Sequence, residues 1–180
     1  MKSKSFIGRQ KELNLLESLY LSKKFEMLIL HGRRRVGKSY LLSHFANLHS
    51  KNVVYFTGDK SSEKNNVKNF CEELNKVLAA GDFIKSFTTW NDVYSFLKNA
   101  EIKERLVLII DEFTYLYNSN PAYDSELQNA IDKILKLKNI FLILCDSEVS
   151  VIEEIIDNST KPLYGRKTAE LKLLPFTYKE

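Results

Sequence analysis

The sequence predicts an α/β fold in which a parallel sheet of five strands lies between layers of helices. Short apolar runs alternate with segments whose apolar residues recur at helical spacing, an order that builds parallel sheets with right-handed crossovers. A glycine-containing segment joins the first apolar run to a helical segment. The 180 residues are enough for one domain. A domain of this size buries about 70% of its unfolded surface.

The five expected strands are short runs of apolar or β-branched residues. They cover residues 25–30, 53–56, 106–110, 140–144 and 169–174. The runs at 106–110 and 140–144 are apolar at every position, which is typical of a sheet covered on both faces. The last run alternates only loosely between apolar and polar residues.

The expected helices follow from apolar spacing and from capping residues. They cover the segments up to residue 21, from 38 to 48, up to about residue 80, from 89, from 125 and after Ser147. Gly81 is expected to end the third. Thr89 with Asp92 and Ser125 with Gln128 have capping-box spacing. Residues 57–66 and 117–123 are expected to be loops, and Trp90 is expected in the core.

The segment after the first strand fits the pattern G-x-x-x-x-G-K-[ST] of phosphate-binding loops. It consists of Gly32, Arg33, Arg34, Arg35, Val36, Gly37, Lys38 and Ser39, followed by Tyr40. The backbone amides of such a loop form an anion cradle. Lys38 would reach the β- and γ-phosphates of ATP, and the Ser39 hydroxyl would bind Mg²⁺. The sequence therefore predicts a three-layer P-loop nucleotide hydrolase, with residues 32–40 holding the nucleotide.

Two acidic residues follow the third strand at the sheet edge where the loop is expected. Asp111 is placed to hold the Mg²⁺ that Ser39 also contacts. Glu112, one residue further out, is placed to orient or deprotonate a water that attacks the γ-phosphate. The alternative is that both residues only mark where a buried strand meets solvent.

Several other polar residues have two interpretations. Ser147 could donate a hydrogen bond to the γ-phosphate or cap the next helix. Asp146 would repel phosphate unless it pairs with a cation. Arg166 could stabilise γ-phosphate charge, in its own subunit or in a neighbouring one, or form a surface ion pair. The side chains of Arg33, Arg34 and Arg35 are expected to face solvent or partner groups.

The composition narrows the class of protein. The net charge of +4 permits a nucleic-acid partner without arguing for one. The apolar runs are too short to span a bilayer, so no membrane association is expected. Cys71 and Cys145 are not spaced as a metal or redox pair. They are interpreted as free, buried thiols in a reducing cytoplasm.

Five segments carry a family resemblance. They are Phe6-Ile7-Gly8-Arg9 with Glu12-Leu13, the loop at 32–39, the strand end at 109–113, Pro162-Leu163-Tyr164-Gly165-Arg166, and Leu174-Pro175-Phe176. Together they resemble the archaeal-type ATPase family, a branch of AAA-like P-loop ATPases near the signal-transduction ATPases with numerous domains. The resemblance implies that Phe6, Ile7 and Arg9 lie near the adenine and that Arg166 senses phosphate. Cys145-Asp146-Ser147 departs from the Gly-Ser usual in that family.

Members of that family usually continue into a helical lid and a winged-helix domain, and residues 1–180 are expected to be the single ATPase core without them. The leading hypothesis is Mg²⁺-dependent ATP hydrolysis that is slow and drives or gates a conformational switch. One alternative is a nucleotide-binding regulatory module without significant hydrolysis. Another is a DNA-binding accessory protein. Self-association or a protein partner is compatible with all three.

Overall fold

The computed structural model describes residues 8–176 of the chain. All the strand pairs of its five-stranded sheet are parallel, and the strand order is β2-β3-β4-β1-β5. The strands are β1 (Glu26–His31), β2 (Val53–Thr57), β3 (Leu106–Asp111), β4 (Ile140–Asp146) and β5 (Ala169–Lys172). The predicted fold class is therefore confirmed.

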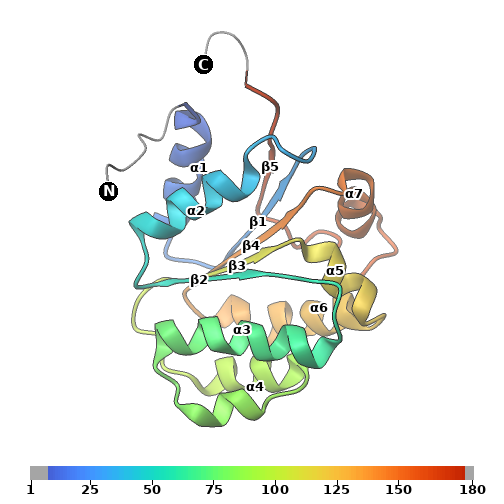
Figure 1. Cartoon of the computed structure of the whole chain (residues 1–180). Helices are drawn as coiled ribbons and strands as arrows, with labels where there is room; N and C mark the ends of the chain where they lie inside the picture. Colours follow the sequence, from blue (N-terminus) through green and yellow to red (C-terminus); the bar gives the residue numbers. More distant parts are fainter. Residues whose placement is uncertain (1–7, 177–180) are drawn as a thin grey trace.

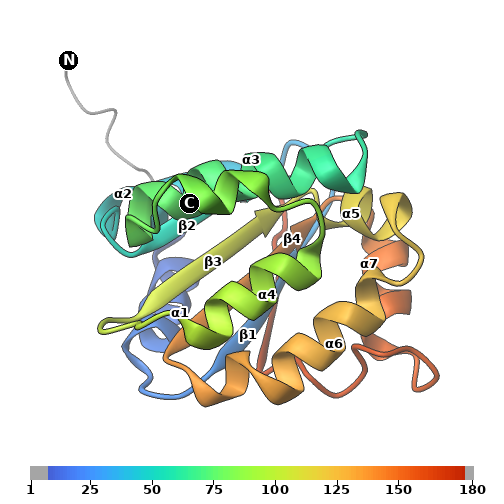
Figure 2. The same ribbon diagram turned by 90° about the horizontal axis from the view of Figure 1, so that it is seen from below.

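Helices cover both faces of the sheet (Figure 1). On one face lie α1 (Gln10–Leu21) and α2 (Lys38–Leu48). The other face is covered by α3 (Glu63–Leu78), α4 (Trp90–Asn99), α5 (Phe113–Ser119), α6 (Tyr123–Lys133) and α7 (Val149–Asp157). Two short 3₁₀ helices, η1 (Asp82–Ser86) and η2 (Leu135–Leu137), complete the fold. Figure 2 shows α3, α4 and α6 from below the sheet.

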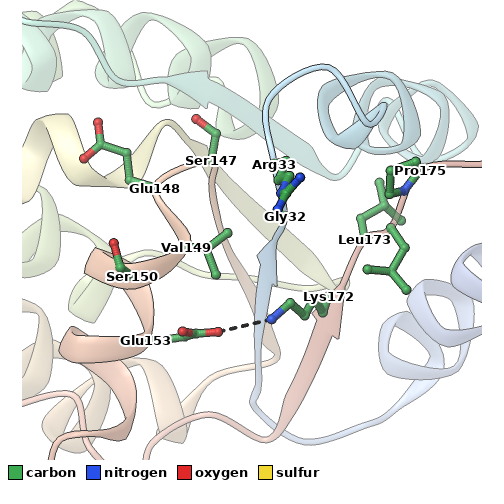
Figure 3. Close-up of a pocket in the computed structure, with 11 residues that line it drawn as sticks. Gly32, Arg33, Ser147, Glu148, Val149, Ser150, Glu153, Lys172, Leu173 and Pro175 are labelled. Carbon is green, nitrogen blue, oxygen red and sulfur yellow. Dashed lines mark hydrogen bonds and ion pairs between the residues drawn. The ribbon is translucent and has the colours of Figure 1, made fainter.

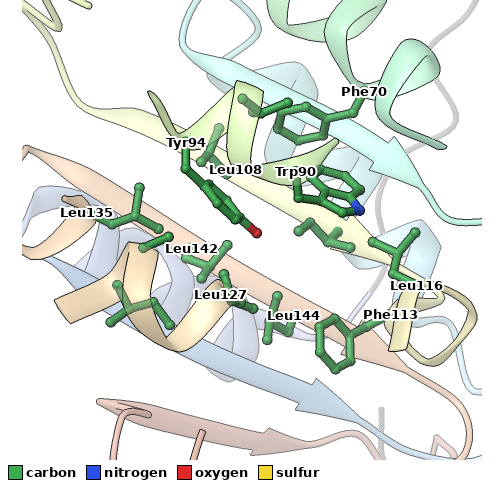
Figure 4. Close-up of a cluster of buried hydrophobic side chains, with 14 of the residues drawn as sticks. Phe70, Trp90, Tyr94, Leu108, Phe113, Leu116, Leu127, Leu135, Leu142 and Leu144 are labelled. Carbon is green, nitrogen blue, oxygen red and sulfur yellow. The ribbon is translucent and has the colours of Figure 1, made fainter. Parts of the chain in front are cut away.

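A hydrophobic core lies on each face. The larger core packs α3 to α7 against the sheet and contains the fully buried Trp90, as predicted (Figure 4). Within it, Trp90 and Phe70 meet edge to face, with 5.2 Å between their ring centroids. The smaller core packs α1 and α2 against the other face and includes Cys145. Both cysteines are buried and unpaired, as expected.

The helix starts and ends on the larger core's side were predicted less well than the strands. The capping box at Thr89 is present, with both of its hydrogen bonds to Asp92. The one expected at Ser125 is wrong, because α6 already begins at Tyr123 and Ser125 lies inside it. The cause is a local turn, in which the side chain of Asn120 accepts a hydrogen bond from the Ala122 amide.

Two further corrections concern neighbouring segments. Residues 117–123 are not one loop, because α5 extends to Ser119. The helix α3 begins at Glu63, inside the expected loop, with Ser62 as its N-cap. Its end is formed not by Gly81 but by Ala79, which adopts the left-handed conformation with φ 47°. Among residues 8–176, no helix is both long and apolar enough to cross a membrane.

Candidate functional site

The loop between β1 and α2 lies where the chain leaves the carboxyl end of a central strand. Its backbone depends on two glycines with positive φ, Gly32 at 153° and Gly37 at 97°. A Cβ on Gly32 would lie 2.4 Å from the carbonyl oxygen of Leu173. Gly37 precedes the first residue of α2, so the amino end of that helix points at the loop.

Lys38 is buried although it carries a charge. Its ammonium donates hydrogen bonds to the carbonyl oxygens of Gly32, at 2.8 Å, and of Arg33, at 3.1 Å. The lysine therefore folds back over the loop that it belongs to. The side chains of Arg33, Arg34 and Arg35 are exposed, as expected.

Ser39 and Asp111, which the sequence placed 72 positions apart, are in direct contact. The Ser39 hydroxyl donates to Asp111 Oδ2 at 2.7 Å. Tyr55 on β2 donates to the same oxygen at 2.8 Å. The Glu112 amide donates to Asp111 Oδ1 at 3.1 Å. Three hydrogen-bond donors thus hold the Asp111 carboxylate, which is only 4% exposed. One of the three, Tyr55, was not predicted from the sequence.

Glu112 adopts the left-handed conformation with φ 54°, which is rare for a residue with a Cβ. Burial raises the pKa of its carboxyl group above the usual value, and the nearby charge of Asp146 adds to this. The positive charges of Arg34 and Lys38 act in the opposite direction on this pKa. A carboxylate with a raised pKa is a stronger base, which suits proton abstraction from water.

A pocket of about 350 Å³ brings most of these residues together. It is lined by Arg34, Arg35, Gly37, Lys38, Ser39, Tyr40, Glu112 and Ser147. The loop, the first turn of α2 and the ends of β3 and β4 therefore face one space.

Ser147 does not cap α7 with its side chain. It accepts a hydrogen bond from Arg34 Nε at 3.4 Å, across the mouth of the pocket. Asp146 is fully buried and acts structurally. Its carboxylate accepts from the Thr114 amide at 2.6 Å, the Thr114 hydroxyl at 2.7 Å and the Glu148 amide at 2.7 Å. Asp146 therefore joins the starts of α5 and α7.

A second pocket, of about 780 Å³, adjoins the first at Ser147 (Figure 3). Figure 3 shows Ser147 and Glu148 on one side, Gly32 and Arg33 at the loop, and the segment after β5 on the other side. Glu153 on α7 and Lys172 on β5 pair across it at 3.4 Å. The two pockets together extend from β3 to the edge strand β5.

Of the residues expected near the adenine, Phe6 and Ile7 lie outside the described residues. Arg9 is buried, and its polar groups are used within the chain. It donates to the carbonyl oxygens of Val36 at 3.2 Å and Leu174 at 2.6 Å, and it pairs with Glu12. Its guanidinium also lies 4.1 Å from the ring centroid of Phe176. Arg9 therefore fastens the loop to the segment after β5.

The structure separates Arg166 from the pocket, so the expectation that it reaches the γ-phosphate within its own chain is wrong. Its guanidinium pairs with Asp132 at 2.6 Å and donates to the carbonyl of Pro162. The side chain of Thr168, two residues after Arg166, accepts a hydrogen bond from the Met27 amide near the start of β1. The loop at residues 32–39, in contrast, follows the end of β1. At about 3.3 Å per residue, Met27 and the loop lie roughly 15 Å apart along β1.

The donor set at Ser39 and Asp111 fits Mg²⁺. A hydroxyl and a carboxylate are hard oxygen ligands. Within residues 8–176, no group of three or more His, Cys, Asp or Glu side chains could hold a metal ion.

Comparison with known proteins identifies a family of ATPase domains. The model of a family described as an ATPase domain predominantly from Archaea matches residues 6–180. An uncharacterized protein of Methanocaldococcus jannaschii, MJECL04, is 32% identical over 174 residues, which are 97% of this chain and 37% of the relative. The uncharacterized ATP-binding protein MJ1076 of the same organism is 26% identical over 86% of this chain and 55% of its own length.

Two solved structures share the fold. The Walker-type ATPase PaBY2304 of Pyrococcus abyssi has a TM-score of 0.69 at 18% identity and is matched over 98% of this chain and 56% of its own. Cdc6p of Pyrobaculum aerophilum has a TM-score of 0.61 at 18% identity, with 97% of this chain and 48% of its own covered. The chain thus spans about a third to just over half the length of these four proteins.

Proposed function

The chain belongs to this family of ATPase domains, and from that premise we propose that it binds MgATP at residues 32–40 and hydrolyses it slowly to drive or gate a conformational change. The contact between Ser39 Oγ and Asp111 Oδ2, at 2.7 Å, is the observation that carries the proposal. It joins the loop that would hold phosphates to a carboxylate that would hold their metal ion.

In this proposal each side chain of the site has its own role. The loop amides and Lys38 bind phosphate oxygens. To do so, the Lys38 ammonium gives up its hydrogen bonds to the Gly32 and Arg33 carbonyls. Ser39 and Asp111 would hold Mg²⁺, which would supply positive charge to the phosphates. Glu112 orients the attacking water and takes its proton. Ser147 and Arg34 line the same pocket.

A second candidate is a nucleotide-binding module with little hydrolysis. The observation that favours it is the distance of Arg166 from the loop, because the chain then lacks the arginine expected to stabilise transition-state charge. Residues beyond those of this chain, such as a lid, or a neighbouring subunit would then control turnover. A cytoplasmic location remains part of the proposal, supported by the two free thiols.

The test compares the unmodified chain with Lys38→Ala and Glu112→Gln. ATP with Mg²⁺ at about 100 times its dissociation constant should stabilise the unmodified chain by about 2.7 kcal/mol. Lys38→Ala should abolish this stabilisation, whereas Glu112→Gln should keep it and lose phosphate release. Lys98→Ala, on the exposed face of α4, is the matched control and should behave like the unmodified chain.

The outcomes separate the two candidates. Stabilisation by ATP without phosphate release from any variant would favour the binding module. Equal phosphate release from all four proteins would show that hydrolysis does not occur at this site and would contradict the proposal.

A further inference from the structure

Tyr55 is a polar residue at the site, and the proposed function gives it no role. It lies on β2, the edge strand next to β3, two residues before the end of the strand. Its backbone is in register with Ile109, so it lies two positions before the partner of Asp111. Residues two apart on a strand face the same side of a sheet. The ring of Tyr55 therefore runs along the α2 face toward Asp111.

The Tyr55 hydroxyl donates a hydrogen bond to Asp111 Oδ2, the oxygen that also accepts a hydrogen bond from Ser39. The distances to Asp111 Oδ2 are 2.8 Å from Tyr55 and 2.7 Å from Ser39. The hydroxyls of Tyr55 and Ser39 therefore both bind one oxygen of Asp111, while the Glu112 amide binds the other oxygen. The carboxylate is clamped at both oxygens before any ligand arrives.

We infer that Tyr55 is a positioning residue for the metal site: its hydroxyl orients Asp111, so that Mg²⁺ bound with ATP finds the carboxylate and the Ser39 oxygen already in place. The inference rests on the proposed function. It adds a residue of β2 to a site otherwise made from the loop, α2 and β3.

The clamp has a chemical consequence for Ser39. A serine hydroxyl has one proton and two lone pairs. With its proton directed at Asp111 Oδ2, its lone pairs face away from the carboxylate and are free to bind a cation. If Tyr55 did not hold Asp111, the carboxylate could rotate, and the Ser39 proton would lose its fixed direction. Partners that orient metal ligands in this way typically contribute about 10–100-fold to metal affinity.

The packing of Tyr55 allows its hydroxyl to be tested alone. The ring is half-buried against the smaller core, so Tyr55→Phe keeps the ring contacts and removes the hydroxyl, which donates to Asp111 and also contacts the Ser43 side chain. Tyr20 offers a matched control. It is also half-buried against that core, and its hydroxyl accepts from Asn52 at 3.3 Å, at the opposite end of β2.

The experiment measures ATP binding as Mg²⁺ is titrated, and again in excess chelator. Tyr55→Phe should raise the Mg²⁺ concentration for half-maximal binding by about tenfold, the lower end of the range for such partners, because Asp111 is expected to act on the metal partly through water. Metal-free ATP affinity should change by less than about twofold. Tyr20→Phe should match the unmodified chain in both titrations.

A double-mutant cycle tests the route of the effect. In an Asp111→Ala background, Tyr55→Phe should have no further effect on the Mg²⁺ requirement, because the group it positions is gone. An unchanged Mg²⁺ requirement in Tyr55→Phe, or an equal loss of affinity with and without Mg²⁺, would overturn the inference while leaving the proposed function intact. If the unmodified chain shows no Mg²⁺-dependent ATP binding, the proposed function fails first and this inference fails with it.

Discussion

Arginines at the two ends of the sheet are used in different ways. At the amino ends of the strands, Arg105 is 6% exposed and donates to the Leu19 carbonyl at 2.8 Å, the Lys24 carbonyl and Asn139. Arg166 is likewise paired with Asp132. At the carboxyl ends, the three loop arginines are exposed. The difference teaches that an arginine's distance from the loop, and not its place in a motif, decides whether it can meet a phosphate.

The largest expected effect lies at the amino end. Arg105→Ala removes the donors to two partly buried carbonyls, those of Leu19 in α1 and of Lys24 in the segment after it. It should lower the free energy of unfolding by about 3 kcal/mol, since each such group costs about 1–3 kcal/mol. The same measurement on Arg166→Ala should show a loss of at most about 1 kcal/mol, the range for exposed pairs. Equal losses would mean that burial does not distinguish these arginines.

At the carboxyl end, Gly32→Ala should act on the loop itself. Its Cβ would meet the Leu173 carbonyl at 2.4 Å, so the loop or the end of β5 must shift. ATP affinity should fall by at least about tenfold, equivalent to about 1.4 kcal/mol. Gly81→Ala is the control, because φ is also positive at 91° but no atom other than Phe83 comes within 4 Å. It should lose stability and keep its ATP affinity.

The loop arginines themselves should differ. Arg34 reaches Ser147 at the pocket, whereas Arg33 faces the adjoining larger pocket. Arg34→Ala should lower the ratio of ATP to ADP affinity by about tenfold, about the strength of one charged hydrogen bond to the γ-phosphate. Arg33→Ala should leave that ratio unchanged. Equal ratios in the two variants would remove Arg34 from the phosphate site.

The smallest effect concerns the charge of Glu112. Since its pKa is raised in the folded state, the folded protein holds this proton more tightly than the unfolded chain does. The charged form therefore costs stability above the folded-state pKa, and the cost disappears as the pH falls below the unfolded value. Glu112→Gln should be more stable at pH 7 by up to about 1 kcal/mol, after screening by solvent, with no difference near pH 4.

Denaturant unfolding at several pH values measures this difference. Glu101→Gln, at an exposed position, is the control and should show no comparable pH-dependent gain. A Glu112→Gln variant that is less stable at pH 7 would contradict the raised pKa.

The strands and the loop could be predicted because each depends on local sequence. Runs such as the one at 106–110 are apolar at every position, and this pattern is typical only of strands covered on both faces. The contact of Ser39 with Asp111 also follows from topology, because carboxyl ends of parallel strands share one edge.

The position of Arg166 follows from the same rule. A residue just before a strand of a parallel sheet lies at the amino edge, and Arg166 precedes β5 by three positions. Tyr55 was harder to identify, since its role depends on the pairing of β2 with β3 and a tyrosine is ordinary in a buried strand. The start of α6 could not be found because a turn at Asn120 competed with the capping pattern at Ser125.

One nitrogen of Arg9 donates to both the Val36 carbonyl and the Leu174 carbonyl. The same guanidinium nitrogen thus binds both the loop at Val36 and the segment that follows β5. A displacement of Leu174 would therefore act on the loop in two ways, through the Arg9 side chain and through the bond between Leu173 and His31 at the end of β1.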